Sequence, residues 1–358
     1  MNKLPLLQIG DLVADKPIIQ GGMGVGISLS KLSSAVANEG GIGVISAVQT
    51  GFREENFTTN TLSTNIQSLR SEIKKARKLS PNGIIGVNIM VAINNYKETV
   101  KAAVEEKIDI IISGAGLPLD LPLLVKGSKT KIAPIVSSAK AAKVIAKSWS
   151  KKYNYLPDFV VVEGPEAGGH LGFSEDQINN NESISLPEIT KEVIETLALF
   201  EEKSGQKIPV IAAGGIFSGA DIAKYLKLGA SGVQMGTRFV ATEECDAHID
   251  YKYAYVNAKE SDVRIVKSPA GLPGRALNNP FAQRFSFEKI TVKSCYNCLK
   301  TCNPATTPYC ISDALIQAAT GNIDEGLIFA GSKVHLIDRI MSVKELMDSL
   351  VKDAELAL

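Results

Sequence analysis

Short apolar segments alternate with amphipathic helical segments from residue 17 onward, and this alternation constrains the fold more than any other feature. The apolar segments are rich in β-branched residues and end in glycine, serine or asparagine, as strands buried on both faces do. Within about 240 residues, the size of a typical (β/α)₈ barrel, they occupy residues 17–23, 42–47, 84–91, 108–115, 131–138, 159–163, 208–215 and 232–239. Helical patterns between them include residues 29–38, 63–78, 96–106, 139–150, 186–202 and 219–228. The order predicts an α/β fold, a (β/α)₈ TIM barrel, with an open doubly wound sheet as the competing architecture.

The pattern changes after residue 239. Residues 243–259 are helical in pattern, 268–275 form a glycine- and proline-rich loop, and 313–320 and 343–357 are helical again. We therefore predict a barrel domain over residues 1–260 and a C-terminal, cysteine-containing, partly helical appendage over residues 261–358, packed on the barrel. The segments 48–61 and 174–185 are long for barrel loops, so each is either a lid or a tolerated surface insertion.

Composition restricts the partners. The 358 residues carry 39 basic and 38 acidic side chains, a net charge of +1, which removes the electrostatic case for nucleic acid or an anionic membrane surface. The first ten residues lack the features of a signal peptide, and no apolar run approaches the ~20 residues that span a bilayer. We expect a cytoplasmic protein with a small-molecule substrate, and an oligomer is compatible with these data.

A single histidine lies where a catalytic group is expected. The apolar run 159–162 leads into Glu163 and the sequence EGPEAGGHLGF, which places His170 just beyond the end of a predicted strand. Catalytic groups in parallel α/β folds lie at the carboxyl ends of strands. We predict His170 as the catalytic residue, and the alternative is a histidine packed into a loop hydrogen-bond network. His248 and His335 are expected to be structural.

Two glycine-rich strand ends predict a phosphate site. Gly214 and Gly215 end the seventh strand, and Gly236 and Thr237 end the eighth. In barrels the loops after these two strands commonly bind phosphate through backbone N–H groups, although glycines also serve tight turns. Gly22 and Met23 end the first strand, where close approach of the backbone suits a flat ring. Asn88 ends the third strand, and its amide could bind the polar edge of that ring. Together these positions describe flavin mononucleotide (FMN) laid across the barrel mouth.

The motifs IIQGGM, GVN, EGPEAGGHLG, IPVIAAGGI and VQMGTRF, in this order, resemble the nitronate monooxygenase family, formerly called 2-nitropropane dioxygenases. The resemblance implies non-covalently bound FMN and oxidation of alkyl nitronates with dioxygen. It makes His170 the active-site histidine and places Gln234 beside the ring or the phosphate. The flavin-contacting positions that it implies are Gly22, Met23, Asn88, Gly214, Gly215, Gly236 and Thr237.

Other functions stay open at this point. The sister group of flavin-dependent enoyl-acyl-carrier-protein reductases shares most of these motifs and would use NAD(P)H, for which Lys267 and Arg275 offer charge. A non-redox phosphate-binding lyase or isomerase and a non-catalytic binding protein are more remote alternatives, since a fold does not fix a function.

Four cysteines depart from the simplest family pattern. Cys295, Cys298, Cys302 and Cys310 fall within sixteen residues, a spacing typical of ligands. An iron–sulfur cluster or zinc is one interpretation, and reduced, partly buried thiols are the other. A cluster would favour a reductase fed by one-electron carriers.

Overall fold

The computed structural model describes residues 3–180 and 182–358. Its centre is a closed parallel barrel with the strand order β10-β11-β3-β4-β5-β6-β7-β8. The strands are β3 (Ile18–Gln20), β4 (Ile42–Ser46), β5 (Ile84–Met90), β6 (Ile110–Gly114), β7 (Lys131–Val136), β8 (Val160–Glu163), β10 (Val210–Ala213) and β11 (Gly232–Met235). Because β11 pairs with β3, the sheet closes on itself. The (β/α)₈ barrel is confirmed, and the open sheet is excluded.

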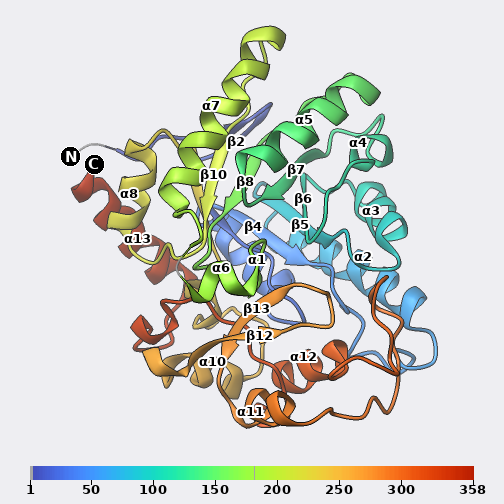
Figure 1. Ribbon diagram of the computed structural model, residues 1–358. Helices are drawn as coiled ribbons and strands as arrows, with labels where there is room; N and C mark the ends of the chain where they lie inside the picture. Colours follow the sequence, from blue (N-terminus) through green and yellow to red (C-terminus); the bar gives the residue numbers. More distant parts are fainter. Residues whose placement is uncertain (1–2, 181) are drawn as a thin grey trace.

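Helices surround the barrel (Figure 1). They are α1 (Ser30–Asn38), α2 (Thr61–Leu79), α3 (Tyr96–Glu105), α4 (Leu121–Leu124), α5 (Ala139–Tyr153), α7 (Leu186–Ser204) and α8 (Gly219–Lys227). Local sequence sets their ends. Helix α7 begins with a capping box between Ser185 and Glu188 and ends at Gly205, whose φ of 74° is left-handed.

A β-hairpin closes one end of the barrel. Strands β1 (Leu7–Ile9) and β2 (Leu12–Ala14) pair antiparallel, and Leu7 and Ile9 pack with inward-facing barrel residues such as Phe159 and Ile211. This hairpin was not expected from the sequence. Since it fills the end where the strands begin, a ligand site is left at the end where they finish.

The C-terminal region packs on the barrel from two sides (Figure 1). Its elements are α10 (Ile249–Val256), the 3₁₀ helix η1 (Glu260–Asp262), β12 (Val263–Lys267), β13 (Pro273–Leu277), α11 (Pro280–Phe287), α12 (Ile311–Ala319), the 3₁₀ helix η2 (Val334–Leu336) and α13 (Val343–Ala357). Strand β13 pairs with β12 and with β9 (Gly169–His170), a short strand in the loop after β8. Helix α13 packs against α8 and α1. The division at residue 260 stays a prediction.

Three local predictions need correction. The eighth strand ends at Met235, and residues beyond Gly236 form α9 (Thr237–Val240). The helix predicted over residues 243–259 is shorter, since only α10 is helical there. The loop 174–185 contains α6 (Glu175–Asn179), capped by Ser174 and Gln177. In the described residues, no helix combines the length and the apolarity needed to cross a membrane.

Candidate functional site

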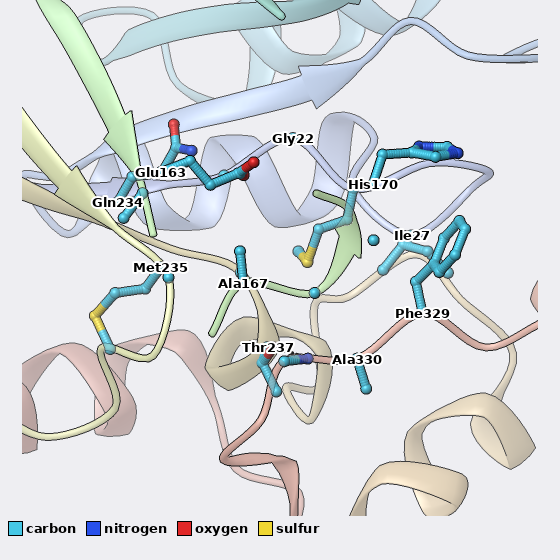
Figure 2. Close-up of a pocket in the computed structure, with 18 of the residues that line it drawn as sticks. Gly22, Ile27, Glu163, Ala167, His170, Gln234, Met235, Thr237, Phe329 and Ala330 are labelled. Atoms are coloured by element: carbon cyan, nitrogen blue, oxygen red, sulfur yellow. Dashed lines mark hydrogen bonds between the residues drawn. The ribbon is translucent and has the colours of Figure 1, made fainter. Parts of the chain in front are cut away.

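One pocket of about 260 Å³ lies at the carboxyl ends of the barrel strands and extends under the C-terminal region. The residues predicted for catalysis and cofactor binding all line it: Gly22, Met23, Asn88, His170, Gly214, Gly215, Gln234, Gly236 and Thr237. Figure 2 shows Glu163 and Gln234 on one side of the pocket and His170 with Phe329 on the other. The fold therefore brings together groups that are more than 200 residues apart in the chain.

Glycines give the pocket a floor without side chains. A Cβ on Gly22 would lie 2.4 Å from the Cβ of Asn88, so the close approach of the segment after β3 to β5 requires glycine. Gly214 and Gly215 have φ values of 96° and 73°, which also favour glycine. Gly236 differs, because a Cβ there would meet only Met23, with Sδ at 3.4 Å. Protein packing therefore does not explain Gly236, and a ligand would.

Polar groups that face a ligand lie on neighbouring strand ends. Ala213 on β10 pairs with both Glu163 and Gln234, so these two side chains are at one level of the barrel. Gln234 Oε1 is buried and has no hydrogen-bond partner among the described residues. Asn88 Nδ2 makes only a long bond, 3.4 Å, to the carbonyl oxygen of Ile112. A buried acceptor without a donor is costly, so Gln234 fits a site completed by a bound group.

His170 lies on β9 and is held by the C-terminal region. Its Nε2 is 2.7 Å from Ser268 Oγ, and its ring packs edge-on against Phe329, with centroids 5.1 Å apart. The N–H of Ala270 donates to the same Ser268 oxygen at 3.2 Å, and the imidazole tautomer sets the direction of the bond between Ser268 and Nε2. Burial lowers the pKa of His170 to about 4, so the imidazole is neutral near pH 7. His170 lines the pocket.

Glu163 was noted in the sequence only as the acidic end of a strand, and the structure makes it part of the site. Burial raises the pKa of Glu163 to about 7, because a carboxylate loses hydration inside the barrel mouth. A carboxyl that is partly protonated near neutral pH can donate a hydrogen bond as well as accept one. Together with Gln234, the Glu163 carboxyl would form hydrogen bonds to the polar edge of a ring.

The opposite wall of the pocket comes from residues far along the chain. Ser332 and Lys333 line it, and the N–H of Gly331 donates to Thr237 Oγ1 at 3.0 Å. Lys333 Nζ is 3.5 Å from Asp221 Oδ2. Sequence reasoning missed these residues, because they lie about 100 positions beyond the strand ends that they face and belong to no glycine motif.

The glycine turn after β10 faces a carboxylate. A Cβ on Gly215 would fall 2.3 Å from Glu166 Oε2, and Ser332 Oγ donates to that oxygen at 3.2 Å. Since Glu166 repels a phosphate and Lys333 attracts one, we place the favourable charge for an anion at Lys333.

Arg275 does not carry free charge for a nucleotide. It is 8% exposed, and its Nη1 donates to the carbonyl oxygens of Pro165 at 2.6 Å and Ala167 at 3.2 Å. It therefore fixes the loop that carries His170. The idea that Arg275 binds the phosphates of NAD(P)H is wrong for this arrangement.

The remaining histidines lie outside the pocket. His248 Nδ1 accepts from the N–H of Asp250 at the start of α10. His335 belongs to η2, and its Nδ1 is buried without a partner in the part of the chain described. Neither lines the pocket.

The four cysteines line a second cavity of about 200 Å³. Cys298, Cys302 and Cys310 are half-buried, Cys295 is exposed, and all four are free thiols. Within residues 3–180 and 182–358, no three His, Cys, Asp or Glu side chains are grouped as ligands of one metal ion. The metal hypothesis for these residues stays a prediction.

Known proteins resemble this chain over most of its length. The nitronate monooxygenase family model matches residues 8–353. A probable nitronate monooxygenase from Staphylococcus aureus (strain Newman) is 30% identical over 320 residues, covering 80% of this chain and 81% of that protein. A (3aS,4S,5R,7aS)-5-hydroxy-7a-methyl-1-oxo-octahydro-1H-indene-4-carboxyl-CoA dehydrogenase from Rhodococcus jostii (strain RHA1) is 26% identical, covering 94% of this chain and 92% of that protein.

Two solved structures also resemble this chain over most of its length. FabK from Thermotoga maritima has a TM-score of 0.73 and 28% identity, covering 96% of this chain and 93% of the other. Nitroalkane oxidase from Streptomyces ansochromogenes shares the fold, with a TM-score of 0.73 at 22% identity and coverage of 96% and 97%. Since the family model spans nearly the whole chain, the protein belongs to the nitronate monooxygenase family and is an oxidoreductase.

Proposed function

We propose that the protein binds FMN in the strand-end pocket and oxidises alkyl nitronates with dioxygen. The observation that carries this proposal is a neutral, pocket-facing His170 opposite a polar edge made by Glu163 and Gln234. When bound, FMN would supply the electron chemistry, and the protein would supply binding, orientation and electrostatics.

The pocket residues fit the cofactor in kind and place. The buried Oε1 of Gln234 needs a donor, which the polar edge of a flavin ring offers. Gly22 and Met23 line the pocket after β3, and the Asn88 amide makes only one long hydrogen bond. Gly214, Gly236, Thr237 and Lys333 would hold the phosphate, with Lys333 as the cation.

His170 would bind and orient the substrate above the glycine floor. Because burial keeps the imidazole neutral, it suits accepting a proton or a hydrogen bond. A proton on His170 inside this pocket would be stabilised by a neighbouring anion, such as a nitronate.

A direct assay is oxygen consumption by the purified protein supplied with an alkyl nitronate and no NAD(P)H. We expect nitronate-dependent uptake of dioxygen, together with a flavin absorption band in the purified protein. A colourless protein would instead favour the lyase, isomerase or binding alternatives. A yellow protein that consumes no dioxygen with nitronate would contradict the substrate proposal and leave the flavin proposal standing.

The second candidate is an enoyl-thioester reductase that uses NAD(P)H. Its support is the 28% identity with FabK over 96% of this chain, together with the similarity to a dehydrogenase named for a CoA thioester. NAD(P)H oxidation that depends on an enoyl thioester, with no response to nitronate, would make it the better account.

A further inference from the structure

The four-cysteine segment has little regular structure to hold it. Between the end of α11 at Phe287 and the start of α12 at Ile311, the described chain contains no helix and no named strand. Loops of this length without structure of their own are uncommon in compact domains. A bound group that crosslinks the segment would explain how the loop keeps one conformation, as metal binding does in other small segments.

The middle of the segment is anchored to the barrel loops. The N–H of Lys300 donates to Ala92 O at 3.0 Å, and Tyr296 stacks on Phe57 with centroids 5.2 Å apart. Asn94 Nδ2 donates to Asn297 Oδ1 at 2.8 Å. These contacts fix the Tyr296–Lys300 stretch against the barrel loops. With that stretch in place, all four cysteines still line one cavity.

The size of the cavity discriminates between two kinds of metal centre. Zinc draws four thiolates to about 2.3 Å from one point, and one small atom fills only a small part of about 200 Å³. The four cysteines line a cavity with room for more than one metal atom. A multi-atom cluster, in which each thiolate binds a different metal atom, fits a set of thiols spread around a larger space.

The cavity lies next to the candidate active site. Ile311, at the start of α12, lines the cysteine cavity, and Leu315 on the same helix lines the main pocket. Four residues of α-helix rise about 6 Å. A group held by the cysteines would therefore lie about one helical turn from the pocket wall.

We propose that Cys295, Cys298, Cys302 and Cys310 ligate a [4Fe–4S] cluster that orders the segment between α11 and α12. The cluster takes one thiolate per iron, which matches the four cysteines that line the cavity. Cys245 is excluded from this set, because it is 4% exposed and its thiol contacts Ile27 O at 3.4 Å elsewhere in the fold.

The test is metal and sulfide analysis of the full-length protein, purified without oxygen and reconstituted with ferrous iron and sulfide. We expect about four iron and four sulfide per chain, with a charge-transfer absorption that bleaches on reduction with dithionite. The double variant Cys295→Ser/Cys302→Ser should lose most of the iron and sulfide. The matched control, Cys245→Ser, should retain both.

Three results would overturn the proposal: a wild-type protein without iron, one zinc per chain without sulfide, or full iron and sulfide content in the double variant. The wild-type analysis decides the question even where the double variant fails to fold. FMN content, measured in the same samples after acid release, separates a failure of the cluster proposal from a failure of the flavin proposal.

Discussion

At the scale of single residues, His170 and Glu163 are shifted in opposite directions by the same cause. Burial lowers the pKa of the histidine to about 4 and raises that of the glutamate to about 7. Both groups are therefore mostly uncharged around pH 5 to 6, and Glu163 is about half ionised at pH 7. Two uncharged groups on opposite sides of the pocket suit an uncharged ring, while Glu166 and Lys333 carry the charges of the lining.

His170→Asn should keep the flavin and lower turnover. The amide retains a polar group beside Ser268 but cannot accept a proton in the reaction. Loss of a proton acceptor typically costs ~10²–10⁴-fold in rate, so we expect a loss of that order with neutral nitroalkane and a smaller loss with pre-formed nitronate. Initial rates on the two substrates provide the measurement, and equal rates for variant and wild type on both would refute the role of His170.

Glu163→Gln should change how stability depends on pH. In the folded state the glutamate has a pKa of about 7, against a reference value of 4.5, so the folded protein binds more protons between these two pH values. The contribution of Glu163 to the free energy of unfolding of the wild type therefore decreases as the pH rises from 4.5 to 7. Glutamine does not titrate, so the variant does not show this decrease. In urea unfolding of FMN-free protein, the free energy of unfolding of the variant should increase relative to that of the wild type from pH 4.5 to 7.

The gain of Glu163→Gln should level off above about pH 7, where the wild-type carboxyl is ionised. His170→Asn provides a control of opposite sign, because the lowered pKa of the histidine makes wild-type stability rise between pH 4 and 6.5. A constant difference between Glu163→Gln and wild type across the window would show that Glu163 is not held protonated.

At the scale of elements, the connection from β11 to α9 offers a test of ligand contact. Gly236→Ala places a Cβ where only Met23 lies close, and a φ of −110° is open to alanine. We expect unchanged thermal unfolding of the FMN-free protein and FMN binding weaker by about tenfold or more, the factor that follows from ~1.4 kcal/mol of steric loss. Full FMN occupancy in this variant would show that the phosphate does not bind at this turn.

The segment before η2 offers a second test through charge. Lys333→Ala removes the cation that faces Asp221 and the pocket, and a charge-assisted hydrogen bond contributes roughly 1.5–3 kcal/mol. The dissociation constant of FMN, measured by fluorescence, should therefore rise roughly tenfold or more. The increase should be smaller at high salt, where the charge is screened. Lys352→Ala, an exposed position on α13, should leave FMN affinity unchanged.

Some elements were predictable from sequence and others were not. The eight barrel strands followed from β-branched runs, because each run is local and buried on both faces. The antiparallel sheet of β9, β12 and β13 was missed, since Gly169 pairs with Arg275 more than 100 residues later and no local pattern encodes that pairing. The strand predicted through Phe239 was too long, because the chain turns into α9 after Gly236.

The candidate site divides in the same way. Gly22, Gly214 and Gly236 were predicted to line the pocket because glycine-rich loops at the carboxyl ends of barrel strands commonly contact a ligand, and His170 followed a strand directly. Ser268, Phe329 and Lys333 were not found, since each reaches the pocket from a separate element of the C-terminal region. Sequence patterns predicted the pocket residues that lie at the ends of barrel strands, and not those that come from the C-terminal region.

At the scale of the whole molecule, the C-terminal region completes both the site and the barrel wall. It supplies Ser268 to His170, and α13 packs against α8 and α1. The N–H of Leu4 donates to Glu355 Oε1 on α13 at 3.3 Å, so the beginning and the end of the chain meet on one side of the barrel. Residues 261–358 are thus tied to the barrel at several places.

Anaerobic stopped-flow absorbance measures whether a flavin in the strand-end pocket takes electrons from a nitronate. The protein, as purified, is mixed without oxygen with an alkyl nitronate, or separately with NADH or NADPH. We predict rapid bleaching of the flavin band by nitronate and slow or no bleaching by either nicotinamide nucleotide. Rapid bleaching by NAD(P)H with no response to nitronate would contradict the account and identify the protein as a reductase.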